Sequence, residues 1–472
     1  MKPCKGAKPI HCLVIVSGFL LQFVLLNAQE TLTLADQIRG TWVGEIDISG
    51  RKLPLIINID ESNGAYFGTL DSPEQGVFGT GIEEILPMED SIYLGFHKQV
   101  ANYKGEFNKG YTAIDGVWTQ GRYKLPLKLI KTEEEFIQKR PQEPTKPFPY
   151  TEQDVIFKNL QDSIFLAGTV TIPFGEGPFP GVVLLSGSGP QNRDEEVFGH
   201  RPFLVLADFL TKHGFAVLRY DDRGVAKSEG DFEEASQTEL KNDALAAYRF
   251  LVSGERVDDH KVGILGHSEG GLLAAQISSE ENLAFIILLS TPAQQGHEIL
   301  AAQNQIIMEK TGFSQRAVEA RVKFIKKLYT ILYEEPDNDD AIIRIDNYIR
   351  DSIPPNLLNK TNLQVIATSL MTAWAREFLN YSPADDLKRA DEPVLAIFGG
   401  KDVQVPKENA MLMEQILTNN EFNEVMLFAE LNHLLQNADT GMPNEYGLIQ
   451  ETIDPVVLKI INDWLQKILS SH

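Results

Sequence analysis

The stretch VGILGHSEGGLLAA, residues 262–275, decides the fold of this chain. It begins with an apolar run, turns through a segment rich in glycine, and continues in residues that favour helices. Gly266-His267-Ser268-Glu269-Gly270 matches the pattern G-x-S-x-G, between a predicted buried strand and a predicted helix. In that context the pattern predicts a nucleophile elbow, a strained turn that lifts the serine hydroxyl above a sheet. Side chains at positions 266 and 270 would collide with neighbouring backbone, which explains both glycines.

The sequence around this elbow predicts the α/β class. Residues 151–472 contain further strands that are apolar along their whole length, and amphipathic helices separate them. Strands of this kind are typical of a mostly parallel sheet with helices on both faces. Residues 293–381 interrupt the alternation with helical patterns only, so we expect an inserted helical cap over the carboxyl edge of the sheet. A helical pair at the periphery is the alternative.

The N-terminal half has a different pattern. Residues 36–131 read as short strands with alternating apolar and polar residues, which predicts a small antiparallel barrel or sandwich. Residues 132–150 combine charge with proline and are interpreted as a linker. Trp42, Tyr93 and Trp118 could form a sugar-stacking surface, but aromatic residues scattered over strands are typical of a core.

Residues 1–28 have the layout of a signal peptide. Lys2, Lys5 and Lys8 precede an apolar segment, and Ala28 marks a site of small residues suited to cleavage. We therefore expect a secreted or periplasmic protein that has no stable membrane insertion after cleavage; a retained anchor is the alternative. Cys4 and Cys12 would leave with this segment.

The net charge of the chain argues against one class of binding partner. The chain carries 43 Lys and Arg against 66 Asp and Glu, a formal charge of -23. Such a surface repels nucleic acid, so we expect no nucleic-acid partner. The oligomeric state does not follow from these numbers.

Five motifs resemble those of the α/β-hydrolase family, over roughly residues 154–471: GHSEG, LLSGSGPQNRDE, YDDRGVAKSEG, FGGKDVQVP and LNHLLQ. Together they look like the serine aminopeptidase-like (S33-type) branch and its secreted carboxylesterases, which often carry an N-terminal β-domain. The resemblance implies that the catalytic residues follow the order Ser, Asp, His along the chain. It also implies that charged residues at three matching positions brace loops: Arg193, Asp194 and Arg223.

A serine hydroxyl needs a neighbouring base, usually a histidine oriented by a carboxylate. His433 follows the last predicted strand, at the sheet edge where Ser268 also emerges. Asp402 follows the strand before that one. We therefore predict a triad of Ser268, Asp402 and His433. His200 and His297 stay open as rival bases, and a purely turn-forming role stays open for Asp402.

Two backbone N–H groups should stabilise the oxyanion of the reaction. The resemblance implies that Glu269 supplies one of them, because it follows the nucleophile. The loop from Ser186 to Gly189 supplies the other, through Ser188 or its neighbour Gly187. Many relatives have His where this chain has Ser186, so the choice between the two donors stays open.

These observations predict a secreted serine hydrolase that cleaves carboxylic esters of short acyl groups through an acyl-enzyme, with no metal or cofactor. A small-molecule or glycan ester, such as an acetylated sugar, is the expected substrate. A serine exopeptidase of the prolyl or aminopeptidase type is one alternative, for which cap carboxylates could grip a free amine: Glu298, Glu309 and Glu319. A catalytically decayed glycan-binding protein is the other. The cap also offers apolar residues to roof an acyl pocket: Met308, Leu328, Tyr329, Leu332, Tyr333, Trp374 and Phe378.

Overall fold

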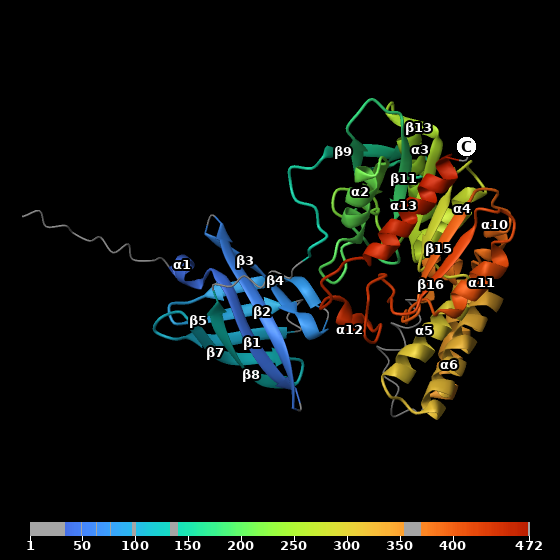
Figure 1. Cartoon of the computed structure of the whole chain (residues 1–472). Helices are drawn as coiled ribbons and strands as arrows, with labels where there is room; N and C mark the ends of the chain where they lie inside the picture. The colour runs from blue at the N-terminus through green and yellow to red at the C-terminus, as the bar shows by residue number, and fades with distance from the viewer. Residues whose placement is uncertain are drawn as a thin grey trace, which may run out of the picture.

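The computed structural model describes residues 34–48, 50–62, 64–75, 77–96, 101–132, 140–353 and 370–470. Along the chain, a closed β-barrel is followed by an α/β sheet with helices on both faces (Figure 1). The predicted signal peptide, with Cys4 and Cys12, lies outside the described residues. Within the described ranges, we find no helix whose length and apolar character would let it span a membrane.

The first unit is a closed barrel of eight antiparallel strands, each paired with its neighbour in sequence. The alternation of side chains along each strand sends one set into the interior, where Trp42 and Trp118 are buried. These two tryptophans therefore belong to the core and not to a sugar-stacking surface, while Tyr93 is half-buried beneath Lys104. The elements are α1 (Leu34–Ile38), β1 (Gly40–Ile48), β2 (Arg51–Ser62), β3 (Ala65–Ser72), the 3-10 helix η1 (Pro73–Gln75), β4 (Val77–Pro87), β5 (Ser91–Phe96), β6 (Ala101–Phe107), β7 (Ala113–Gln120) and β8 (Tyr123–Thr132).

The second unit is built on an eight-stranded sheet with the order β16-β15-β14-β13-β11-β12-β10-β9. The strands from β11 to β16 run parallel, and the β9–β10 hairpin extends the sheet beyond β12, with which β10 pairs antiparallel. This arrangement confirms the α/β prediction. The strands are β9 (Tyr150–Asn159), β10 (Ile164–Pro173), β11 (Phe179–Leu185), β12 (Ala216–Tyr220), β13 (Val257–His267), β14 (Ile286–Leu289), β15 (Val394–Gly399) and β16 (Glu424–Phe428).

Helices cover both faces of this sheet, so its central strands are buried on both sides. Helices α2 (Pro202–Lys212) and α13 (Pro455–Ser470) pack over one face, and α3 (Gln237–Val252), α4 (Glu269–Ser278) and α11 (Glu408–Ile416) pack over the other. In Figure 1 α13 crosses the near side of the sheet beside α2. Two short helices complete the unit: α10 (Ala384–Leu387) and α12 (Pro443–Tyr446).

The inserted cap is confirmed between β14 and β15. Its described helices are α5 (Gly296–Lys310), α6 (Gln315–Glu334), α7 (Asn338–Ser352) and α9 (Ala373–Asn380), and α5 and α6 extend beyond the end of the sheet (Figure 1). The cap has a small core of its own, in which Leu328 and Leu332 pack against Ile345. Helix α9 also lies against α3, so the cap is attached to the sheet unit on that side.

Part of the predicted linker is bound to the α/β unit by hydrogen bonds. The Arg140 guanidinium donates to the carbonyl oxygens of Gly199 at 2.9 Å and Gly447 at 3.0 Å. Gln142 accepts from the Thr452 N–H at 2.6 Å and donates to the Ile453 carbonyl at 2.6 Å. The α/β unit therefore includes residues from Arg140 onward. The barrel approaches the same region, because η1 lies close to α12.

Candidate active site

The G-x-S-x-G segment forms the strained turn that its sequence predicts. Ser268 lies between β13 and α4 with φ 50° and ψ −116°, in a region that residues other than glycine seldom occupy. A Cβ at Gly266 would collide with the backbone of Gly270, and a Cβ at Gly270 would collide with the Leu185 carbonyl. The turn therefore holds the Ser268 hydroxyl at the N-terminus of α4, where the helix dipole favours negative charge.

The predicted base and acid lie in hydrogen-bond contact. His433 Nδ1 is 2.8 Å from Asp402 Oδ2, and both side chains are buried. The other oxygen of Asp402 accepts from the backbone N–H groups of Gln404 at 2.7 Å and Val405 at 2.8 Å. Backbone donors thus fix the carboxylate, and the carboxylate in turn orients the imidazole.

The rival residues occupy structural positions. His200 Nε2 lies 2.9 Å from the Tyr446 carbonyl, and its Nδ1 lies 3.1 Å from Thr452 Oγ1. Burial, together with the Arg140 charge, lowers the pKa of His200 to about 4. His297 Nδ1 lies 3.2 Å from the Leu379 carbonyl within the cap.

Ser268 and His433 line one cavity of about 410 Å³ between the sheet edge and the cap. Its walls are mostly apolar, with three glutamine side chains among the lining residues: Pro292, Ile299, Leu300, Trp374, Phe378, Val405, Leu434, Gln191, Gln303 and Gln404. Such a volume is at the lower end of the range for small-molecule sites. No cluster of three His, Cys, Asp or Glu side chains suited to a metal ion occurs among the residues that the structure describes.

The cap contributes fewer residues to this cavity than the sequence predicts. Trp374 and Phe378 line it, with their rings stacked at a centroid distance of 4.9 Å. Leu328 and Leu332 pack inside the cap instead, and Tyr333 is 68% exposed. Met308 and Tyr329 do not line the cavity either. The periodicity of apolar residues in the cap helices correctly identified an apolar face, but that face packs into the core of the cap and does not line the cavity.

The structure distinguishes the two predicted oxyanion donors of the β11–α2 loop. The Gly187 N–H donates to Glu195 Oε1 at 2.7 Å, so it is already engaged and does not fit the donor role. The physical reason is that a single N–H cannot serve both the carboxylate and an oxyanion. Ser188 follows directly and lines the cavity together with Ser268 and Glu269. Ser188 is therefore the remaining candidate donor of this loop, beside the candidate Glu269.

The Glu269 side chain joins the elbow to the cap. Its Oε1 accepts from the Trp374 indole N–H at 2.6 Å, and the residue is buried. Burial raises the pKa of Glu269 above its ordinary value. In contrast, the cap carboxylates predicted as possible amine ligands are exposed and do not line the cavity: Glu298, Glu309 and Glu319.

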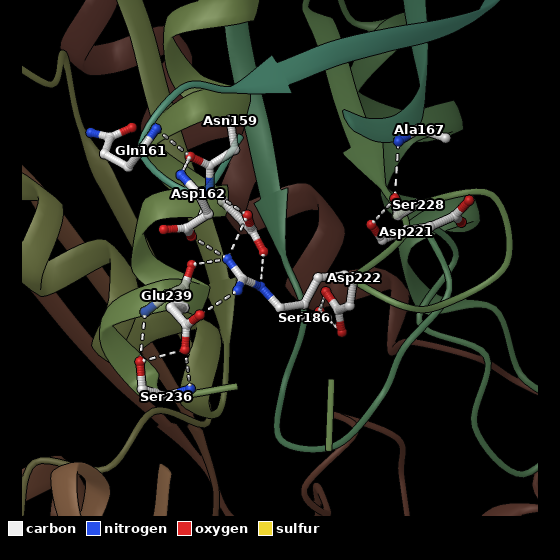
Figure 2. A network of polar contacts seen from close by, with 12 residues as sticks. Asn159, Gln161, Asp162, Ala167, Ser186, Asp221, Asp222, Ser228, Ser236 and Glu239 are labelled. Atoms are coloured by element: carbon white, nitrogen blue, oxygen red, sulfur yellow. Dashed lines mark hydrogen bonds and ion pairs between the residues drawn. The ribbon is translucent and has the colours of Figure 1, made fainter. Parts of the chain in front are cut away.

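Buried charges brace the loops beside the oxyanion donors, as the resemblance implied. Arg193 binds Asp221 through Nη2 at 2.6 Å, and Arg219 binds Asp194 at 2.7 Å. Arg223 contacts carboxylates from two further elements at 2.6 Å each, Asp162 after β9 and Asp243 on α3. Figure 2 shows part of this network and labels two of its acids, Asp162 and Asp221.

Asp222 is bound by hydrogen bonds to the loop that carries the candidate oxyanion donors. Its carboxyl accepts from Ser186 Oγ at 3.0 Å and from the Gln191 N–H at 2.9 Å, and Figure 2 shows Asp222 beside Ser186. Burial is the main cause that raises the pKa of Asp222 to about 8, with further contributions from Asp243 and Glu195. This carboxyl is therefore mostly protonated at neutral pH.

Several residues of the site were missed by reasoning from sequence. Glu195 is buried, and its carboxylate contacts both the oxyanion loop and His267. Asn432 is buried beside the base, and its Oδ1 accepts from the N–H groups of Leu434 and Gln436 at 3.0 Å each. No spacing rule singles out Glu195, because its partners lie on distant segments. The Asn beside His433 could have been found, since Asn favours turns through such bonds.

Comparison with known proteins places the chain in a family. The profile of the family "Serine aminopeptidase, S33" matches residues 201–438, just over half of the 472 residues. Esterase EstD of Thermotoga maritima is 28% identical over 396 residues, which cover 82% of each chain. Among solved structures, the Pyrococcus furiosus esterase Pf2001 is 16% identical, with a TM-score of 0.41, over 71% of this chain and 99% of its own. Est1E of Butyrivibrio proteoclasticus with bound ferulic acid is 17% identical, with a TM-score of 0.38, over 67% of this chain and 98% of its own. With the elbow, the α/β sheet and the inserted cap in place, this chain belongs to the serine aminopeptidase S33 family of α/β-hydrolases.

Proposed function

We propose that this chain is a serine esterase that cleaves carboxylic esters of short acyl groups through an acyl-enzyme. One observation carries the proposal: the Asp402–His433 pair, with its 2.8 Å hydrogen bond, opens on the cavity that Ser268 also lines. The hydrolysis of esters by EstD of Thermotoga maritima, implied by its name, supports the same reaction class.

The proposed reaction assigns to these groups the roles that a Ser–His–Asp triad performs. Ser268 Oγ attacks the ester carbonyl while His433 Nε2 accepts the hydroxyl proton. The N–H groups of Ser188 and Glu269 stabilise the oxyanion, and Asp402 stabilises the imidazolium. His433 then returns the proton to the leaving alcohol oxygen, and the acyl group stays on Ser268. Water, deprotonated by His433, attacks this acyl-enzyme and releases the acid.

The shape of the cavity supports the short acyl group. Trp374 and Phe378 line it on the cap side, and its volume of about 410 Å³ is at the lower end of the range for small-molecule sites. The exopeptidase alternative is less well supported. It needs a carboxylate that is free to bind an amine, but Glu195 and Glu269, which line the cavity, already hold other groups. The intact set of catalytic groups argues against a decayed glycan-binding protein.

The expected location is outside the cytoplasm. This part of the proposal rests on the signal-peptide pattern of residues 1–28 alone. Acetylated sugars remain a candidate substrate within the class of short esters.

A substrate panel tests the proposal. We expect nitrophenyl acetate and butyrate to be hydrolysed faster than the palmitate ester, and aminoacyl anilides to be cleaved slowly. A fluorophosphonate should label the enzyme but not the Ser268→Ala variant. Faster turnover of anilides than esters would favour the exopeptidase, and lack of labelling would refute serine catalysis.

A further inference from the structure

A second carboxylate–histidine pair lies beside the predicted triad. Glu195 Oε1 is 2.8 Å from His267 Nδ1, and the two side chains are buried. Glu195 has φ 51°, an unfavourable value for a residue with a side chain, so the surrounding structure must hold it in place. His267 is the residue before the nucleophile Ser268, and the sequence gives it no role of its own.

The pair contacts two parts of the catalytic machinery. The same Glu195 oxygen also accepts from the Gly187 N–H at 2.7 Å, one residue before the oxyanion donor Ser188. On its other side, His267 Nε2 is 3.1 Å from the backbone carbonyl of His433. The pair therefore connects the oxyanion loop to the loop of the catalytic base, through the elbow itself.

The contacts of His267 define its charge. Each of its ring nitrogens faces an acceptor, a carboxylate on one side and a carbonyl on the other. A neutral imidazole donates from one nitrogen only, so beside an ionised Glu195 both contacts are satisfied only by the imidazolium. Burial by itself lowers the pKa of His267, but the Glu195 charge and the two hydrogen bonds raise it above its ordinary value.

Other ionisable groups near the pair do not disturb this assignment. Asp402 lies beyond His433 and adds negative potential that also favours the His267 cation. The imidazole of His433 lies close by, with the ring centroids 4.8 Å apart. Asp222, which faces Glu195, is mostly neutral below its pKa of about 8. With both groups ionised, the Glu195–His267 pair has no net charge.

We propose that Glu195 and His267 form an ionised pair that positions both the oxyanion loop and the base His433, and that acyl transfer depends on it. Neither residue touches the reacting atoms, so both are positioning residues. This inference rests on the esterase function proposed above. It predicts that loss of the pair weakens binding of the transition state far more than binding of the substrate.

Glu195→Gln is the decisive variant. In this variant the glutamine oxygen can still accept from the Gly187 N–H. A neutral His267 donates from only one ring nitrogen, however, so it loses its hydrogen bond either to the glutamine or to the His433 carbonyl. We expect kcat for nitrophenyl acetate to fall about a hundredfold, while KM changes by less than about threefold. Affinity for a trifluoromethyl ketone, which forms a tetrahedral adduct, should fall by about the same factor as kcat/KM.

Glu196→Gln is the matched control, since Glu196 is the exposed neighbour and its carboxylate accepts from the Asn192 amide at 3.2 Å. It should keep wild-type kcat. His267→Asn should resemble Glu195→Gln, and the double variant should be little worse than either, because the two residues act as a unit. Equal kcat for Glu195→Gln and Glu196→Gln would overturn the inference.

The protonation state of His267 can also be measured in the wild-type chain, so the inference can be tested even if a variant does not fold. With ¹⁵N-labelled histidine, the NMR signals of His267 should be those of a ring protonated on both nitrogens at neutral pH. A neutral His267 would overturn the inference. If the wild-type enzyme neither hydrolyses esters nor reacts with a fluorophosphonate, the proposed function itself fails, and the NMR result then still reports on the pair.

Discussion

Replacement of Asp402 by asparagine tests the site most sharply, because the structure fixes how the new side chain would sit. Oδ1 of Asp402 accepts two backbone N–H groups, those of Gln404 and Val405, while Oδ2 faces His433 Nδ1. The asparagine oxygen must take the first position, since its NH₂ group there would face two donors. The NH₂ group therefore faces His433 and donates to Nδ1.

His433 is then held in the wrong tautomer. With Nδ1 as acceptor, the ring proton sits on Nε2, and that nitrogen cannot take the proton from Ser268. We expect kcat to fall by about 10⁴, which corresponds to about 5 kcal/mol of transition-state stabilisation. KM should change little, because the cavity walls are untouched.

The assay is hydrolysis of nitrophenyl acetate, with circular dichroism to verify the fold. The two backbone hydrogen bonds survive in Asp402→Asn, so the variant should fold. Asp385→Asn, at an exposed carboxylate before β15, serves as the control and should keep full activity. If folded Asp402→Asn retains kcat within about tenfold of wild type, the assigned role of Asp402 is wrong.

Three further predictions follow from the site and the domain boundary. Ser268→Ala and His433→Ala should each lower kcat by about 10⁴ or more, and the double variant should be little worse; full activity of either would contradict the triad. A chain that begins at Arg140 keeps the contacts of that residue to the α/β unit and should hydrolyse nitrophenyl acetate within about tenfold of the full chain; a folded but inert product would refute the independence of the two units. Asp222 keeps its proton in the folded chain up to a pKa of about 8 but ionises near pH 4 when unfolded, so its contribution to stability falls as the pH rises through this window. Asp222→Asn should therefore gain melting temperature relative to wild type between about pH 5 and pH 8, and an unchanged difference would contradict the raised pKa.

The sequence alone determined the parts of this protein that depend on short-range patterns. Strands that alternate apolar and polar residues distinguished the barrel from the continuously apolar strands of the α/β sheet, and helical periodicity located the inserted cap. These patterns can be read locally because they depend on whether one or both faces of an element are buried. The elbow could be recognised because only glycine fits at positions 266 and 270, two residues before and after Ser268. Asp402 and His433 could be predicted from topology, since the loops after parallel strands meet at one sheet edge.

Tertiary structure alone decided what joins these parts. Glu195 and His267 are 72 residues apart in sequence, and nothing in either segment predicts that they pair. The same Glu195 oxygen accepts from the Gly187 N–H, which leaves Ser188 as the candidate oxyanion donor of its loop. The cap shows the same limit, because its periodicity predicts an apolar face but not whether the face covers the cavity or its own core. Hydrogen bonds and packing between distant segments depend on how loops are placed in three dimensions, and that placement follows from the packing of the whole fold.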